Sequence, residues 1–298
     1  MTREREGELF MLLLCILESC FPILSIIAIP LVGALYAYAI VIAVATVLLL
    51  LLLLRKGGLA TLFTPAAQKD LLLTSFFITS LFLLVFLGLK YTTAGNMAVI
   101  IFLQLAFSYL YFNVFGSERL TPLHTIGAVI MSFGAILMLF PESFRLNAGD
   151  LMILAAAAIA PLANLYQKRA RVHVGSMAIL TYRNLVALPL LCLIAYSFEP
   201  LPGSDALIEA LPYLLAIALL VYVAAKILWI EALHRISITK MSAMLALMPL
   251  FTLIFAYFVL DEVPTLRQMA GILPILLGGY LITRPEAGKT AIEVPGRD

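Results

Sequence analysis

The most informative part of the sequence is residues 247–278, LMPLFTLIFAYFVLDEVPTLRQMAGILPILLG, which align without a gap to residues 103–134, LQLAFSYLYFNVFGSERLTPLHTIGAVIMSFG. The spacing between residue 103 and residue 247 is 144 positions, and it brings Glu118 onto Glu262 and Gly127 onto Gly271. Self-similarity at a fixed spacing indicates that one structural unit occurs more than once. We therefore interpret the chain as two copies of one unit.

The composition determines the kind of unit. Hydrophobic residues make up 63% of the 298 residues and charged residues only 12%, whereas soluble proteins carry about 25% charged residues. About 20 apolar residues span the hydrocarbon core as a helix. The connections between such stretches are too short for a soluble catalytic or nucleotide-binding domain. Ten stretches of this kind fit the sequence, at residues 9–29, 31–54, 71–89, 94–115, 122–141, 150–167, 176–198, 211–233, 239–260 and 266–283.

The Lys and Arg residues between these spans are unevenly distributed. If the loops alternate between the two sides of a membrane, most of these residues fall on one side, and only Lys90, Arg145 and Arg267 fall on the other. Cytoplasmic loops of membrane proteins carry the excess of Lys and Arg. We therefore expect a multi-pass protein of the bacterial inner membrane with both termini in the cytoplasm.

Each copy of the repeat contains five spans, so the second copy must cross the membrane upside down relative to the first. We predict an all-α integral membrane protein of ten transmembrane helices, arranged as two inverted five-helix repeats over residues 1–145 and 146–298. Inverted repeats are a common plan of secondary transporters, whose substrate sites lie near the bilayer midplane between the halves. A duplicated scaffold without transport is the alternative, although a scaffold has no use for two equivalent gates.

Ionisable residues inside the predicted spans are candidate functional residues, because each costs about 2.5–3.5 kcal/mol on insertion scales. Glu18 lies near the middle of the first span, and we expect it to bind substrate and to exchange the coupling proton. The alternative is a neutral Glu18 in a structural hydrogen bond. Lys226 lies about 10 Å inside its span, where it could contact substrate or pair permanently with Glu18, and the sequence leaves both possibilities open.

Polar and aromatic residues add to this candidate site. Tyr222 and Trp229 follow helical spacing around Lys226, so they are expected on its face of the helix. Gln104 and Tyr111 share a face of the fourth span, although polar side chains of this kind also simply join helices. The predicted substrate-binding set is Glu18, Lys226, Trp229, Tyr222, Gln104, Tyr111 and Asn164.

We predict structural roles for two further charged residues and for three prolines. Arg183 and Glu231 lie toward the same ends of neighbouring spans, and we expect them to form a structural or gating ion pair. Glu118 and Glu262 are expected at structural turns. Proline lacks the backbone N–H that continues a helix, and interrupted helices often form transporter sites. Helix breaks are therefore predicted at Pro22, Pro161 and Pro249.

The repeated segments also resemble a known family, the EamA-like domain of the drug/metabolite transporter superfamily. The resemblance rests on the segments 88–134 and 232–278, with Pro249-Leu-Phe251, Asp261-Glu262 and Gly271, and on Asn164-Leu-Tyr-Gln167 and Tyr182-Arg183-Asn184. It covers nearly the whole chain. It implies ten helices in two inverted bundles and transport of small organic solutes, commonly amino acids or other metabolites.

These observations favour a proton-coupled or exchange carrier for a small metabolite such as an amino acid or related amine, with export preferred over uptake. Broad multidrug efflux is the alternative within the same class. An intramembrane enzyme is disfavoured, because all three His residues lie at span ends and no His-Glu-x-x-His motif occurs. We expect no cofactor, no metal and no nucleic-acid partner, and a monomer or weak dimer in the lipid bilayer.

Overall fold

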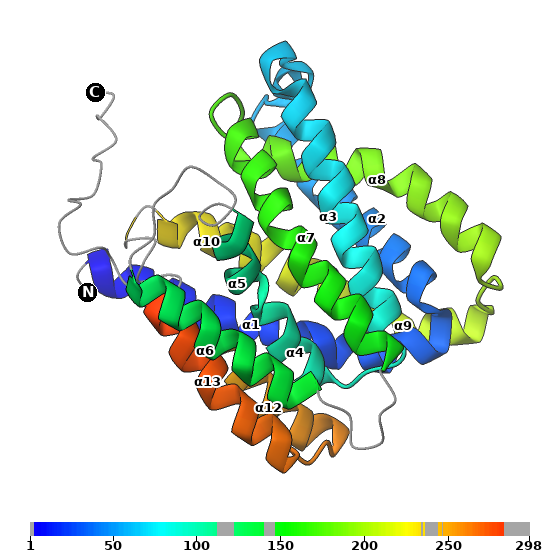
Figure 1. Ribbon diagram of the computed structural model, residues 1–298. Helices are drawn as coiled ribbons and strands as arrows, with labels where there is room; N and C mark the ends of the chain where they lie inside the picture. Colours follow the sequence, from blue (N-terminus) through cyan, green and yellow to red (C-terminus); the bar gives the residue numbers. More distant parts are fainter. Residues whose placement is uncertain are drawn as a thin grey trace.

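The computed structural model describes residues 3–111, 122–139, 147–233, 235, 244–245 and 247–282, and over these ranges its regular secondary structure is entirely helical (Figure 1). Two short 3₁₀ helices, η1 (Leu59–Phe63) and η2 (Pro65–Ala67), lie in one connection. The segment η4 (Ile217–Ala225) is a π-helix. The α-helices are α1 (Arg3–Val32), α2 (Ala34–Arg55), α3 (Gln68–Leu89), α4 (Ala94–Phe102), α5 (Gln104–Tyr109), α6 (Pro122–Leu139), α7 (Ala148–Ala170), α8 (Ser176–Phe198), α9 (Ser204–Ala216), α10 (Lys226–Leu233), α12 (Leu247–Leu260) and α13 (Leu266–Ile282).

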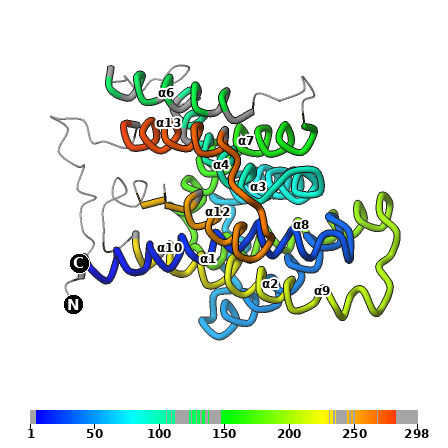
Figure 2. Tube along the Cα trace, turned by 90° about the horizontal axis from the view of Figure 1, so that it is seen from below, coloured from blue at the N-terminus to red at the C-terminus, as the bar shows by residue number. Residues whose placement is uncertain are grey.

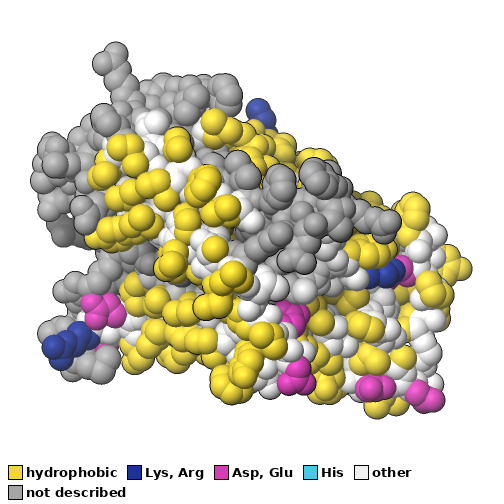
Figure 3. Space-filling model, turned by 60° about the horizontal axis from the view of Figure 1, so that its bottom comes forward, with side chains coloured by type: hydrophobic (Ala, Val, Ile, Leu, Met, Phe, Trp, Pro, Cys, Tyr) yellow, Lys and Arg dark blue, Asp and Glu magenta, His cyan; other side chains and the backbone are white. Residues whose placement is uncertain are grey.

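Helix length and composition confirm a multi-pass membrane protein. In addition to six long apolar helices, three shorter ones, at Ala94–Ser108, Leu250–Leu260 and Gln268–Leu281, fall on predicted spans. Hydrophobic side chains cover much of the described surface in Figure 3, with few charged side chains among them. The full count of ten crossings remains a prediction. Six described helices are long and apolar enough to cross a bilayer, Arg5–Val32, Ala34–Arg55, Pro65–Leu89, Ala148–Ala170, Ser176–Phe198 and Ser204–Trp229.

The predicted helix breaks at Pro22 and Pro161 are wrong. Helix α1 continues through Pro22 and α7 continues through Pro161. A proline removes a single N–H donor, and in a transmembrane helix neighbouring helices can compensate for that loss. Pro249 lies in the first turn of α12, where helices tolerate proline, and a helix break at this position stays a prediction.

The helical path changes at other positions. Leu103 separates α4 from α5, and the repeat spacing of 144 residues relates Leu103 to Leu247, the first residue of α12. A second change is the π-helical segment η4, which connects α9 to α10. Segments of π-helix are rare and occur frequently at functional sites.

Equivalent helices of the two repeats pack against each other in opposite directions. The end of α8 reaches the start of α2, where the Glu199 carboxylate accepts a hydrogen bond from the backbone N–H of Ala34. At the other end of this pair, Leu53 of α2 and Ile179 of α8 share one hydrophobic cluster. Helices α2 and α8 are therefore antiparallel, as inversion of the second repeat requires.

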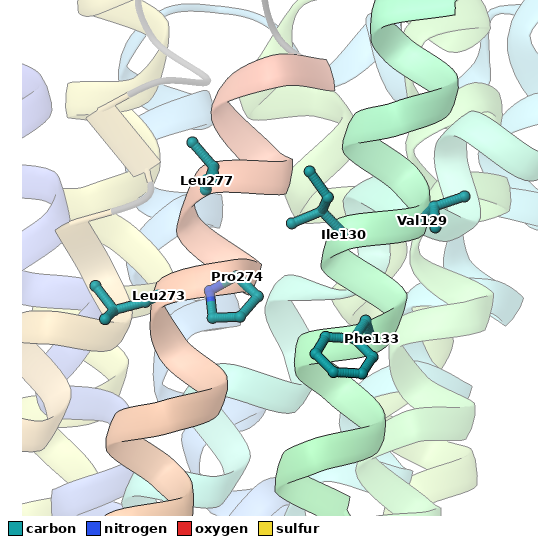
Figure 4. A pocket seen from close by; sticks show the side chains of 6 residues that line it. All are labelled: Val129, Ile130, Phe133, Leu273, Pro274 and Leu277. Atoms are coloured by element: carbon teal, nitrogen blue, oxygen red, sulfur yellow. The ribbon is translucent and has the colours of Figure 1, made fainter.

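Helices α6 and α13 form a second equivalent pair, which lies side by side at one edge of the assembly (Figures 1 and 2). Figure 4 shows the two helices running in opposite directions, with Ile130 near the level of Leu277 and Phe133 nearer Pro274. A side chain on Gly134 would come within 2.7 Å of the Gly271 carbonyl oxygen. Beside this contact lies an apolar groove of about 640 Å³, which is unsuited to a charged solute. It is lined by Val129, Ile130, Phe133, Leu273, Pro274 and Leu277.

The two repeats exchange helices and do not form separate bundles. The first helix of the first repeat, α1, packs against α9, η4 and α10, which together form the third segment of the second repeat. In the same way α7, the first helix of the second repeat, packs against α3. One hydrophobic core contains residues of both halves, from Phe21 to Ile275. Groups that lie between α1 and α10 therefore lie between the repeats.

A close backbone approach holds α3 against α7, and it provides a test of this packing. A Cβ on Gly149 would lie 2.6 Å from the Gly88 carbonyl oxygen and 2.8 Å from the backbone of Tyr91. Because backbone atoms cannot move as a flexible side chain can, we expect Gly149→Ala to destabilise the protein by about 1–3 kcal/mol. Thermal melting in detergent measures the effect. Gly203→Ala is the matched control, since no atom lies within 4 Å of its Cβ position, and an equal loss in both variants would contradict the packing.

Candidate functional site

An ion pair joins the two repeats inside the helix assembly. The Lys226 Nζ atom, at the start of α10, lies 2.5 Å from the Glu18 Oε1 atom of α1 and donates a hydrogen bond to it. The Glu18 side chain is 16% exposed and that of Lys226 27% exposed. Both groups are thus largely removed from the surface, and each provides the other's counter-charge. The structure brings together two residues that are 208 positions apart.

A small cavity adjoins Lys226. Its volume of about 30 Å³ holds little more than a water molecule. Two cations, Arg171 and Lys226, border it, and no carboxylate does so among the described residues. Trp229 lies in its wall, as the sequence predicted for a residue near Lys226. The remaining lining residues are Gln167, Ser176, Ile179 and Leu180.

Arg183 lies deeper, with 4% of its surface exposed. Its Nε atom donates a hydrogen bond of 3.3 Å to the Asn184 Oδ1 atom. The Arg183 Nη2 and Asn184 Nδ2 atoms are buried and have no hydrogen-bond partner within the described part of the chain. The side chains of Glu18, Tyr38 and Tyr222 lie near Arg183.

The predicted ion pair between Arg183 and Glu231 is wrong. Arg235, four residues along the chain, instead donates hydrogen bonds from its Nη1 atom to the Glu231 carboxylate and carbonyl. A partner four residues away in the sequence costs less ordering than a buried partner on another element. Glu231 therefore belongs to the surface at the end of α10, and Arg183 belongs to the core.

Aromatic rings pack beside the charged cluster. The Tyr222 ring lies 5.2 Å from that of Phe82, and the Tyr38 ring stacks on that of Phe86 at 5.0 Å. Phe21, three residues after Glu18, contacts the rings of both Phe82 and Phe86 edge-on. Tyr222 is 1% exposed and its hydroxyl has no partner among the described residues. Tyr222 thus belongs to this aromatic layer, while Trp229 lines the cavity.

The other three predicted substrate residues lie on or beside helices other than α1 and α10. Gln104 begins α5, directly after the change at Leu103. The Tyr111 ring packs at 6.2 Å from that of Phe107. Asn164 is exposed on α7. Among the described residues, no hydrogen bond or ion pair connects any of the three to Glu18 or Lys226, so their role in binding remains a prediction.

At the end of α8 that is remote from the Lys226 cavity, a carboxylate of the second repeat binds the N-terminus of a helix of the first repeat. Glu199, after the last residue of α8, accepts hydrogen bonds of 2.9–3.3 Å from the backbone N–H groups of Ala34, Leu35 and Tyr36. An anion is favoured there because helix N-termini present free donors and a positive dipole end. Gly33 has a φ of 84°, and a Cβ there would lie 2.3 Å from the carboxylate, so the contact requires glycine.

A second carboxylate makes the same kind of contact. Glu262 accepts hydrogen bonds from the N–H groups of Ala94 and Gly95 at the start of α4. Nearby, Gln268 of α13 donates to Asn96 at 2.6 Å, and Asn96 also binds the Asp150 carboxylate. We refer to the Glu199 and Glu262 contacts together as the carboxylate latch.

The sequence identified only part of this latch. Glu262 was expected at a structural turn, and it does bind backbone donors there. Its repeat partner Glu118 lies outside the described residues. Glu199 was not recognised because it follows a span and has no acidic counterpart at residue 55, which is Arg. The only available signal was an acidic residue at the end of one span and a glycine, Gly33, in the short connection before another.

The comparisons with known proteins agree with this architecture. The EamA-like transporter family matches the chain twice, over residues 5–140 and 147–284. A Bacillus subtilis (strain 168) protein named "Uncharacterized transporter YoaV" is 23% identical over 200 residues, which is 66% of this chain and 68% of that protein. An "Uncharacterized transporter" of Archaeoglobus fulgidus is 26% identical over 217 residues, 69% of this chain and 72% of that protein.

A solved crystal structure shares the fold. It superposes with a TM-score of 0.68 at 16% sequence identity, covering 93% of this chain and 96% of that one. Together, the two family matches, the paired antiparallel helices and the apolar spans lead to one conclusion: the chain belongs to the EamA-like transporter family of the drug/metabolite transporter superfamily.

Proposed function

We propose that this protein is a secondary transporter that moves a small organic metabolite, such as an amino acid or related amine, by alternating access. The observation that carries this proposal is the Glu18–Lys226 ion pair. It joins α1 of the first repeat to α10 of the second, which is where carriers built from inverted repeats hold their substrate. A pair of opposite charges suits a zwitterion, since each end of the solute can replace one partner.

Glu18 can couple transport to protons or to exchange. A proton on the Glu18 carboxylate would remove the counter-charge of Lys226, and a substrate group would restore it. Because an unpaired charge in this environment is costly, the change between conformations is favoured only when Lys226 has a partner. This is the condition for obligatory coupling or exchange.

The carboxylate latch supplies a gate. It binds helix starts of the first repeat to carboxylates of the second, so it holds the repeats together at one end. The positive-inside distribution of Lys and Arg assigns this end to the outside of the cell. The conformation described is then closed to the outside, with the Lys226 cavity on the inner side. We favour export, in which substrate loads from that cavity.

Neutralising Glu18 tests the coupling role. We expect Glu18→Gln to lower solute flux in proteoliposomes at least tenfold and to abolish its dependence on an imposed pH gradient, because the variant cannot exchange a proton. The measurement is uptake of candidate solutes identified by a thermal-shift screen of the purified protein.

Glu231→Gln is the matched control for this experiment. Glu231 is a carboxylate near the end of α10 that bonds Arg235 and does not contact the Glu18–Lys226 pair, and its loss should leave the pH dependence intact. Unchanged flux and pH dependence in Glu18→Gln would contradict the coupling role.

The latch predicts a change in accessibility. Ser25 lies on α1 and is fully buried, so a cysteine there should react slowly with a membrane-impermeant thiol reagent added outside. In a chain without the three native cysteines, we expect Ser25→Cys to react several-fold faster when Glu199→Gln or Glu262→Gln is added, because a neutral amide holds a helix N-terminus less strongly than a carboxylate does.

Glu209→Gln provides the comparison, since Glu209 is an exposed carboxylate on α9. It should not change the labelling rate. If all three substitutions have the same effect, the contacts of Glu199 and Glu262 do not act as a gate.

A further inference from the structure

We propose that Arg183, Asn184 and Lys226 form the binding site for a carboxylate group of the transported solute. This inference rests on the proposed transport function and specifies the chemistry of the substrate: an organic acid or a zwitterion with a free carboxylate. An amine without an acid group would then be excluded.

Charge balance is the first argument. Arg183 and Lys226 carry two positive charges, and Glu18 is the one carboxylate within their electrostatic reach among the described residues. Glu18 bonds Lys226, so Arg183 is left 4% exposed without an anionic partner of its own. A buried unpaired charge is unfavourable. One monoanionic group would neutralise the cluster of Glu18, Lys226 and Arg183.

Unused hydrogen-bond donors are the second argument. The Arg183 Nη2 and Asn184 Nδ2 atoms are buried, and neither has an acceptor in the described ranges. Buried donors are nearly always satisfied in folded proteins. The Arg183 Nε atom already donates to Asn184 Oδ1, which holds the two side chains together. Guanidinium and amide N–H groups both donate to carboxylate oxygens, and such charge-assisted bonds are among the strongest in proteins.

The cavity at Lys226 provides the third argument. Ile179 and Leu180 line it together with Lys226, and Arg183 and Asn184 follow them by one turn of α8. A solute that enters beside Lys226 therefore meets Arg183 as the next layer. The cavity of about 30 Å³ is smaller than such a solute, so Ile179 and Leu180 must move aside on binding.

Trp229 makes binding directly measurable. It is the only Trp in the chain, and it lines the same cavity. The experiment titrates purified full-length protein with 4-methylpentanoate and, separately, with its amide, at constant ionic strength set with chloride. We expect a saturable change of Trp229 fluorescence with the acid and at least tenfold weaker binding of the amide. Equal responses to both probes, or none to either, would overturn the proposal.

Substitutions that change acid binding in opposite directions distinguish an effect on this site from a general loss of stability. Asn184→Asp supplies Arg183 with a permanent carboxylate partner, so the fold is preserved while acid binding weakens at least about tenfold. Lys226→Met should weaken it as well. Glu18→Gln should strengthen it, because the competing carboxylate is lost. Ser197→Asp is the matched control, since it adds the same charge to α8 about 20 Å away, and it should bind as the unmodified protein does.

The results also distinguish this inference from the transport proposal. Selective binding of the acid without flux in proteoliposomes would support the site and contradict the carrier function. Flux that treats an acid and its amide alike would support the carrier and contradict the site. If Asn184→Asp does not fold, as thermal melting would show, the comparison of acid with amide and the opposite effects of Lys226→Met and Glu18→Gln decide the question.

Discussion

Charge within the apolar helix assembly must be neutralised, and the Glu18–Lys226 pair is where this constraint is met. The two partners come from α1 and α10, so the pair forms only when the repeats lie against each other in the observed way. The packing of the two repeats and the neutralisation of their buried charges therefore depend on each other. Removing either charge would therefore weaken a contact between the two halves.

The exchange of helices between the repeats explains how a local change can act on the whole molecule. Helix α1 packs mainly with elements of the second repeat, and α7 packs with α3 of the first. A movement of one repeat must then carry helices embedded in the other. The carboxylate latch at one end and the ion pair in the interior both connect the two repeats.

Sequence patterns predicted the helical architecture and the opposed orientation of the repeats, because hydrophobicity and duplication are carried by composition and spacing alone. The juxtaposition of Glu18 with Lys226 was foreseen as one of two possibilities, since both lie deep in apolar spans. The pairing of Arg183 with Glu231 failed because Arg235, close in sequence, is the easier partner for Glu231. Breaks at Pro22 and Pro161 failed because long packed helices absorb a single missing donor. The latch was largely missed, because the approach of Glu199 to Ala34 depends on tertiary packing that no local pattern records.

The π-helical segment Ile217–Ala225 sets the rotation of the next helix, α10, about its own axis. In a regular α-helix, inserting or deleting one residue rotates the next side chains by about 100° around the axis. A chain one residue shorter in this segment would therefore turn a neighbour of Lys226 toward α1 and direct the ammonium elsewhere. Solute preference among proteins of this architecture could thus diverge through a single-residue change of length, with every residue of the site itself retained.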